Sequence, residues 1–92
     1  MYRAISDPTR RRILDLLADQ ERPVKDLVLR FPMSQPALSQ HLRVLRQAGL
    51  VRLRREGRTH VYSVHAAPLK DVYDWADRYR RSWMLLSGPD PG

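Results

Sequence analysis

The 92-residue sequence contains no cysteine. This absence excludes a disulfide framework and any metal site built on thiolates. Long apolar runs are also missing. The longest is a short stretch such as WMLL near the carboxyl end, whereas a membrane-spanning helix needs about 20 apolar residues. Arg3 and Asp7 interrupt the first turns, so nothing there resembles a signal peptide. We therefore expect a soluble cytoplasmic protein that has no contact with a membrane.

The residue patterns of an enzyme are missing as well. The sequence has no glycine-rich phosphate loop and no nucleophile paired with a base. Three acids, Asp71, Asp74 and Asp77, gather late in the chain, but no histidine accompanies them. We therefore expect no enzymatic activity and no cofactor.

Acidic residues are few compared with basic ones. Ten Asp and Glu oppose 17 Lys and Arg, of which only Lys25 and Lys70 are lysines, and the net charge is +7. Six arginines fall between positions 43 and 58, with Glu56 as the only acid among them. A guanidinium pairs bidentately with a phosphate or a guanine edge, so this balance favours a nucleic-acid partner over an ordinary solvated basic surface.

Capping residues and apolar periodicity divide the chain into short elements. Asp7 and Pro8 suit the start of a helix, Ser34 suits the start of another, and Gly49 suits a helix end. Alternation of apolar and polar residues around a glycine predicts a hairpin after Gly49. The predicted elements are a helical turn at 2–5, helices over 7–19, 24–31 and 34–47, two strands within 50–64 joined near Gly57, a helix over 67–86 and a frayed tail over 87–92.

Only Pro32 and Met33 separate the second and third of these helices. So short a join is typical of a helix-turn-helix, and the hairpin that follows makes it the winged form. We predict a mainly α chain with a small β-hairpin, arranged as a single winged helix-turn-helix domain over 1–92. The helix-turn-helix spans about 24–47, the wing about 50–64 and the terminal helix about 67–86.

The helix from Ser34 has two different faces at about 100° per residue. Leu38, Leu42 and Leu45 share one side, which predicts a core face. The opposite side is polar, and Gln, Arg and Ser are the residue types that read base edges or bond phosphates. In a helix-turn-helix the base-reading residues lie toward the amino end of this helix. The candidate DNA-binding residues are Ser34, Gln35, Pro36, Ser39, Gln40, His41, Arg43 and Arg46.

The hairpin offers a second contact. Arg55 and Arg58 flank Gly57 at its tip, where arginine side chains reach phosphates or an adjacent minor groove. We add both arginines to the candidate DNA-binding residues, with a solvated charge as the alternative for either one alone.

Three stretches together resemble the ArsR family of bacterial winged helix-turn-helix repressors. They are ISDPTRRRILDLL, MSQPALSQHLRVLRQAGLV and RREGRTHVYSV, and the resemblance covers nearly the whole chain. It implies a homodimer that binds a double-stranded DNA operator as a transcriptional regulator, usually a repressor released by an effector. The sequence does not identify an effector.

The chain departs from the metal-sensing members of that family. One familiar site uses two cysteines two positions apart in the first helix of the motif, where this sequence has Pro23 and Lys25. A second site uses aspartate and histidines on the last helix, but no histidine follows His65. We therefore predict no metal-binding residues and place the chain in the branch without recognisable metal sites.

Apolar residues recur at steps of three and four along the predicted terminal helix. Such a stripe is typical of a buried helix face, and a 92-residue chain has few other surfaces on which to bury two tryptophans. We predict that this helix, with residues 2–5, joins two copies of the chain, and packing within one chain is the alternative. The candidate dimerisation residues are Leu69, Val72, Ala76, Tyr79, Trp83 and Leu86.

These observations predict a sequence-specific DNA-binding transcriptional regulator, acting as a homodimeric repressor on a pseudo-palindromic operator. A winged-helix module that binds acidic protein and a metal-responsive repressor are the alternatives. An RNA-binding role fits less well, because a helix does not enter the deep, narrow major groove of RNA.

A first prediction follows from the missing thiols and the scattered histidines. Adding zinc, or removing metal with a chelator, should leave DNA affinity unchanged within error when fluorescence anisotropy is measured on a fixed duplex. A tenfold metal-dependent change would instead implicate His41, His60 and His65.

Overall fold

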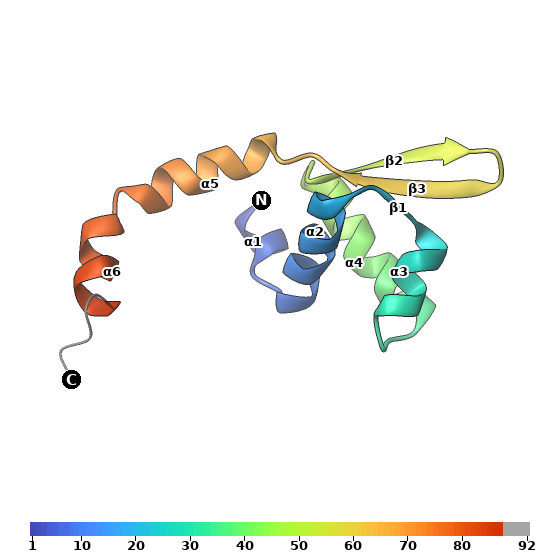
Figure 1. Ribbon diagram of the computed structural model, residues 1–92, viewed down its shortest axis with the longest axis horizontal. Coiled ribbons are helices and arrows are strands. Elements are labelled where there is room, and N and C mark those ends of the chain that lie inside the picture. Colours follow the sequence, from blue (N-terminus) through green and yellow to red (C-terminus); the bar gives the residue numbers. More distant parts are fainter. Residues whose placement is uncertain (88–92) are drawn as a thin grey trace.

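The computed structural model describes residues 1–87 and shows a small helical body from which the last helices extend (Figure 1). The predicted tail lies outside these residues except for Ser87, which ends the last helix. The elements in chain order are α1 (Tyr2–Ile5), α2 (Pro8–Asp19), β1 (Arg22–Pro23), α3 (Val24–Arg30), α4 (Gln35–Gln47), β2 (Val51–Glu56), β3 (Thr59–Val64), α5 (Ala67–Asp77) and α6 (Arg80–Ser87).

The sheet contains one strand more than the predicted hairpin. Strands β2 and β3 pair antiparallel, with Leu53 opposite Tyr62, and β1 adds to the other edge of β3, with Arg22 opposite Tyr62. A two-residue strand has too little alternation to appear in a sequence pattern. The prediction of a mainly helical chain with a small antiparallel hairpin is confirmed, and β1 ties the start of α3 to the wing.

Leucines from several helices form the core between α2, α3, α4 and the sheet. Within the described part of the chain, the largest fully buried side chains are Ile13, Leu17, Leu27, Leu38, Leu42, Leu45 and Leu50. All three leucines predicted for the inner face of α4 are among them. The core therefore sets which side of α4 faces outward.

Both ends of α4 are closed by local hydrogen bonds. The Ser34 hydroxyl accepts from the backbone N–H of Ala37 at 3.2 Å. At the other end Gly49 adopts φ +76°, and the N–H of Leu50 donates to the carbonyl of Leu45 at 2.9 Å. This is the Schellman arrangement, in which glycine takes the left-handed position without steric cost. It also buries Leu50 against the end of the helix.

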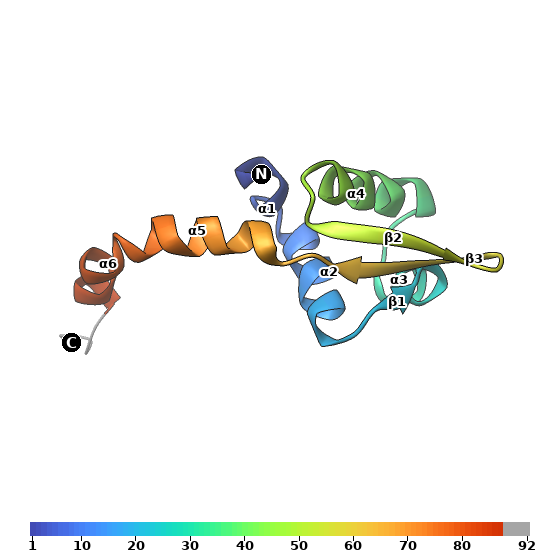
Figure 2. The ribbon, with the colours of Figure 1, turned by 90° about the horizontal axis from the view of Figure 1, so that it is seen from above.

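The single helix predicted over 67–86 is wrong, because the structure divides it into α5 and α6, which run in different directions (Figures 1 and 2). At the break, the N–H groups of Arg78 and Tyr79 donate to carbonyls three residues back, at 3.2 and 2.9 Å. Such bonds tighten the chain into a 3₁₀-type turn. The Arg80 guanidinium then reaches back to the Asp77 carboxylate at 2.6 Å and the Tyr73 hydroxyl at 2.8 Å.

Asp7 caps α2 through its side chain, which accepts from the backbone N–H groups of Thr9 at 2.7 Å and Arg10 at 3.2 Å. Partial burial acts to raise the pKa of this carboxyl, but these hydrogen bonds and the charge of Arg10 outweigh it. The pKa therefore lies below its ordinary value of 3.8. A carboxyl with a lowered pKa stabilises the fold above its unfolded-state pKa, and that contribution is lost as pH falls through the folded-state value.

The second prediction uses Asp7→Asn, because asparagine also caps a helix but does not titrate. As pH falls from about 5 to about 2, the melting temperature of the wild type should fall more than that of the variant, since only the wild-type cap is protonated. Circular dichroism melts at each pH measure this difference. Asp15→Asn, an exposed position on the same helix, is the control. Parallel pH profiles for wild type and Asp7→Asn would contradict the prediction.

Candidate nucleic-acid interface

The residues of the polar face of α4 are exposed to solvent, and the helix lies along one side of the body (Figure 2). Its three inner leucines are at most 2% exposed, and the residues predicted to bind DNA alternate with them along the helix. The exposed members of the predicted set are Ser34, Gln35, Pro36, Ser39, Gln40, Arg43 and Arg46. A helix that presents amides, hydroxyls and guanidinium groups over its whole outer face matches the donors and acceptors of a DNA major groove.

His41 is the member of the set that the structure places differently. It is half-buried, at the edge of the exposed face of α4. One ring nitrogen, Nδ1, lies 3.2 Å from a terminal nitrogen of the Arg10 guanidinium in α2. The same guanidinium donates to the backbone carbonyls of Ala4 at 2.6 Å and Arg3 at 3.0 Å. Arg10 therefore connects α1, α2 and α4.

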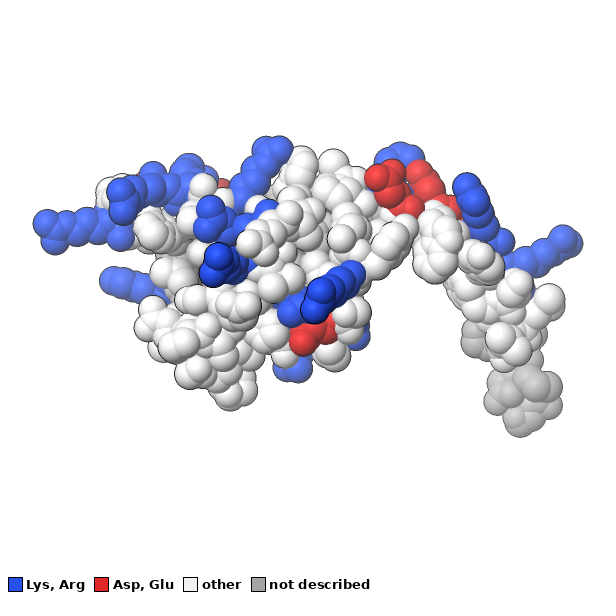
Figure 3. Space-filling view, turned by 180° about the vertical axis from the view of Figure 1, so that it is seen from behind, with Lys and Arg blue, Asp and Glu red and all other residues white. Residues whose placement is uncertain are grey.

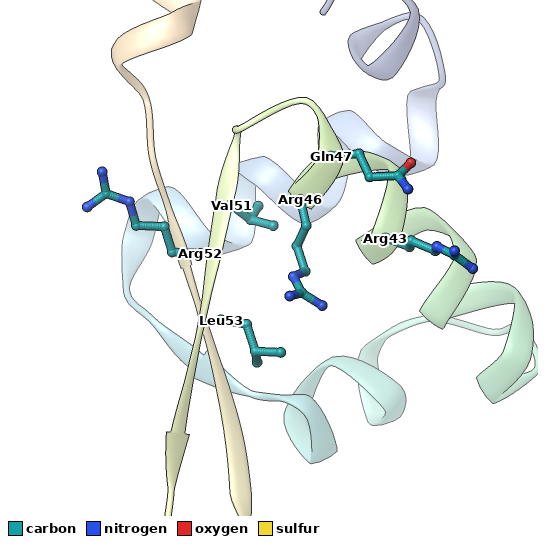
Figure 4. A pocket seen from close by; sticks show the side chains of 6 residues that line it. All are labelled: Arg43, Arg46, Gln47, Val51, Arg52 and Leu53. Atoms are coloured by element: carbon teal, nitrogen blue, oxygen red, sulfur yellow. The ribbon is translucent and has the colours of Figure 1, made fainter.

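A cleft of about 590 Å³ lies between the second half of α4 and strand β2. Figure 4 shows Arg46 reaching from α4 into this space beside Val51 and Leu53, whereas Arg52 extends to the other side of the strand. Arg43 points outward from α4 in the same view. A guanidinium at the floor of an open cleft is a suitable anchor for a phosphate that lies between a recognition helix and a wing.

The tip of the wing carries the two predicted arginines. Glu56 pairs with Thr59 as the last pair of the ladder, and Gly57 between them has φ +63°, a backbone conformation that glycine adopts readily. Arg55 and Arg58 are both exposed there. Both side chains are therefore free to meet a surface that lies beside the exposed face of α4.

Arg54 lies on the same hairpin but its charge is compensated. Its guanidinium donates two hydrogen bonds to Glu21, at 2.9 and 2.8 Å, and two to Glu56, at 2.6 and 3.2 Å. The hydrogen bonds and charge of Arg54 lower the pKa of the Glu21 carboxyl. The bonds to Glu21 and Glu56 likewise raise the pKa of the Arg54 guanidinium. Arg54 thus fastens the wing to the segment between α2 and β1.

Arginine side chains gather along the hairpin and continue across the body, whereas acidic side chains gather on the helix that extends from it (Figure 3). Within residues 1–87, ion pairs engage Arg22, Arg30, Arg54, Lys70 and Arg80. Over the same residues none engages Arg43, Arg46, Arg52, Arg55 or Arg58. Uncompensated charges on α4 and the wing create the potential that attracts a polyanion.

The part of the chain that the structure describes has neither a cluster of metal ligands nor a membrane-spanning helix. No group of three or more histidine, aspartate or glutamate side chains lies close enough together there to hold a metal ion. No helix there is long and apolar enough to cross a membrane.

The fold and this surface define a winged helix-turn-helix protein with a basic face. The sequence profile described as "Bacterial regulatory protein, arsR family" matches residues 7–52. The transcriptional repressor SdpR of Bacillus subtilis is 40% identical over 75 residues, which are 82% of this chain and 83% of that protein. The arsenical resistance operon repressor of Staphylococcus xylosus is 41% identical over 92 residues, covering all of this chain and 82% of the repressor.

Solved structures agree with these sequence relatives. The crystal structure of a possible transcriptional regulator for arsenical resistance superimposes with a TM-score of 0.79 at 34% identity, covering 96% of this chain and 95% of that one. The chain therefore belongs to the ArsR family and is a DNA-binding transcriptional regulator.

Two features of this surface have no signal in the sequence. Arg10 lies 31 residues from His41, and Arg54 lies 33 residues from Glu21. No periodicity or motif joins residues so far apart, so only the folded chain reveals that one arginine is coupled to α4 and another is neutralised. The basic run itself, by contrast, is plain in the sequence.

The third prediction compares two arginines of the wing. Arg55→Ala and Arg54→Ala lower the net charge equally, so any effect of overall charge is the same. Arg55→Ala should reduce the slope of log affinity against log salt concentration by about one, because one phosphate contact is lost. Arg54→Ala should leave the slope nearly unchanged, since Glu21 and Glu56 already neutralise that guanidinium. Anisotropy titrations at several salt concentrations give both slopes. An equal reduction in both slopes would show that Arg54 also contacts DNA, and an unchanged slope for Arg55→Ala would show that Arg55 does not.

Proposed function

We propose that the chain acts as a homodimeric repressor that binds a pseudo-palindromic operator in double-stranded DNA. The observation that carries this proposal is the exposed polar face of α4, with its uncompensated Arg43 and Arg46, next to a wing whose tip carries the exposed Arg55 and Arg58. In a helix-turn-helix the second helix lies in the major groove, and two copies related by a two-fold axis read half-sites about one helical turn apart. The proposed unit is a single winged-helix domain over 1–92, working in the cytoplasm.

The side chains divide by their place on α4 and the wing. Gln35, Pro36, Ser39, Gln40 and Arg43 lie in the first turns or at the centre of the exposed face, where base edges come within reach. Residues at the edges of this face and at the wing tip are proposed to contact the sugar-phosphate backbone of DNA. Such contacts position the protein without reading sequence. The residues proposed to contact the DNA backbone are Ser34, His41, Arg46, Arg55 and Arg58.

Exposed apolar side chains on α5 and α6 support a homodimer. Among the predicted dimerisation residues Leu69 packs against the core and Val72 and Ala76 are half-buried. Tyr79 and Trp83, however, are 52% and 49% exposed in the single chain, and Leu86 is 84% exposed. Apolar surface of this extent on a soluble protein marks an interaction site, and a second copy is the partner that a palindromic operator requires.

Helix α1 extends this apolar surface. The ring of Tyr2 meets Trp75 edge-on at 5.7 Å between centroids, and Trp75 meets Tyr79 in the same way at 5.5 Å. Tyr2 is itself 54% exposed. The proposed interface therefore includes residues 2–5 with the terminal helices.

The direction of regulation is proposed from the relatives. SdpR and the arsenical resistance operon repressor of Staphylococcus xylosus are repressors, whereas HlyU of Vibrio cholerae, 37% identical over 78 residues, is a transcriptional activator. We favour repression. Selecting binding sites from random duplexes and placing the selected site in a promoter would test it, because a repressor lowers reporter output.

The fourth prediction separates the two kinds of DNA contact on the selected operator. Gln40→Ala should cost roughly 1–3 kcal/mol of binding free energy and relax discrimination at one base position. Arg58→Ala should weaken operator and unrelated duplexes by similar factors, because a phosphate contact carries no sequence information. Competition titrations measure both ratios. Interchangeable effects of the two substitutions would show that the roles of α4 and the wing are assigned wrongly.

The fifth prediction concerns the oligomer. Replacing both Tyr79 and Trp83 with glutamate should give folded monomers that have lost operator affinity, since one recognition helix covers only a few base pairs. Sedimentation measures the mass, and circular dichroism reports whether the variant is folded. Leu29→Glu, at a position on α3 that is 85% exposed, introduces a similar charge elsewhere and should remain dimeric. A folded double variant that stays dimeric and binds the operator normally would place the interface elsewhere.

A further inference from the structure

All three nitrogens of the Arg10 guanidinium have partners inside the protein. The same is true of Arg54, but the partners of Arg54 are carboxylates, whereas those of Arg10 are backbone carbonyls and a histidine ring. Nε donates to the carbonyl of Ala4 and one terminal nitrogen donates to the carbonyl of Arg3. The remaining terminal nitrogen lies 3.2 Å from Nδ1 of His41. Arg10 is half-buried, and each of its three nitrogens already makes one hydrogen bond within the protein.

The contact with His41 determines which nitrogen of the histidine ring carries the proton. A guanidinium has donors only and no acceptor, so Nδ1 must accept the hydrogen bond. In the neutral ring the other nitrogen, Nε2, then carries the hydrogen and is a donor. The nearby Asp7 carboxylate accepts from backbone N–H groups of α2, and among the described residues no hydrogen bond joins it to the ring.

The Nε2 donor is open to the outside of the protein. Within residues 1–87, no buried side-chain nitrogen or oxygen lacks a hydrogen-bond partner, and Arg10 is the partner that the structure gives to the His41 ring. Nε2 therefore faces solvent. His41 directly follows Gln40 but lies at the border of the exposed face of α4, next to the start of α2.

A border position of this kind faces a sugar-phosphate strand. A recognition helix in the major groove lies between two backbones, so residues at the centre of its outer face meet bases and residues at the edge meet phosphates. We propose that Arg10 is a positioning residue that sets the tautomer of His41 and directs its Nε2–H to a phosphate of the operator backbone. This proposal rests on the function proposed above and adds a residue that does not itself touch DNA.

The first experiment reads the tautomer without DNA. Two-bond ¹H–¹⁵N correlation spectra of the full chain should show His41 protonated at Nε2 in the wild type, and Arg10→Met should shift it to a mixture of the two tautomers. Arg11→Met is the matched control, because Arg11 also donates to a carbonyl of α1, that of Ile5 at 2.8 Å, but has no hydrogen bond to His41. It removes the same charge and should leave the His41 signals unchanged.

The second experiment reads the phosphate contact with Arg10 intact. The side-chain amide of glutamine can occupy the place of Nε2, whereas that of asparagine ends near the place of Nδ1. His41→Gln should bind the selected operator within about threefold of wild type, and His41→Asn should bind roughly tenfold more weakly, because a hydrogen bond to a charged phosphate is lost. Operator and unrelated duplexes should be affected alike, since no base is read. Arg10→Met should weaken both by a factor similar to that of His41→Asn.

The outcomes are distinguishable. A His41 ring that stays protonated at Nε2 in Arg10→Met, with the variant shown to be folded by circular dichroism, would overturn the role of Arg10 whether or not DNA is bound. Equal affinities for His41→Gln and His41→Asn would overturn the phosphate contact, and this arm does not depend on the folding of any Arg10 variant. A wild-type chain that selects no duplex would instead overturn the proposed function, even if the tautomer follows Arg10.

Discussion

Burial of one side of α4 is the constraint on which the rest of the interface depends. Leu38, Leu42 and Leu45 are at most 2% exposed, and burying a leucine fully stabilises a fold by about 1.5–3 kcal/mol. Rotating the helix about its axis would expose these leucines. Their burial therefore fixes the rotation of α4 and determines which polar side chains face solvent. The Schellman turn at Gly49 then buries Leu50 and directs the chain into β2. Core packing thus orients the proposed DNA-binding surface and starts the wing beside it.

Charge is distributed over that frame in two ways. The arginines of α4 and the wing tip remain uncompensated, which preserves their attraction for phosphates. The charge of Arg54, by contrast, is neutralised by Glu21 and Glu56, and the pair with Glu21 joins the wing to the segment before β1. An exposed ion pair contributes little to global stability. The value of this pairing is therefore geometric, since it restrains the hairpin that presents Arg55 and Arg58.

The terminal helices α5 and α6 make few contacts with the body of the protein. Helix α5 contacts the body mainly through Leu69 and the ring contact between Trp75 and Tyr2, and α6 continues beyond it (Figures 1 and 2). The long dimension of 54 Å, against 26 and 21 Å for the other two, reflects this extension. The large apolar side chains of α6 in the described residues are about half exposed or more, and the proposed second copy would cover them. Helix α1 contacts this surface through Tyr2. The same helix is bonded by Arg10, which also contacts His41 of α4. Helix α1 is therefore a neighbour of both the proposed dimer interface and, through Arg10, the proposed recognition helix.

Local chemistry and periodicity determined the elements that the sequence reveals by itself. The Asp7 and Ser34 caps, the Gly49 terminator, the leucine side of α4 and the alternating strands are each encoded within a few residues, so their predictions agree with the structure. Only the tertiary structure decided the rest. The two-residue strand β1 forms because β3 offers it an edge for pairing. The break between α5 and α6 contains no proline or glycine that would indicate it in the sequence. The neutralisation of Arg54 and the coupling of Arg10 to His41 each join residues more than 30 positions apart. Such contacts depend on where the folded backbone brings two side chains together, and no pattern of neighbouring residues encodes that.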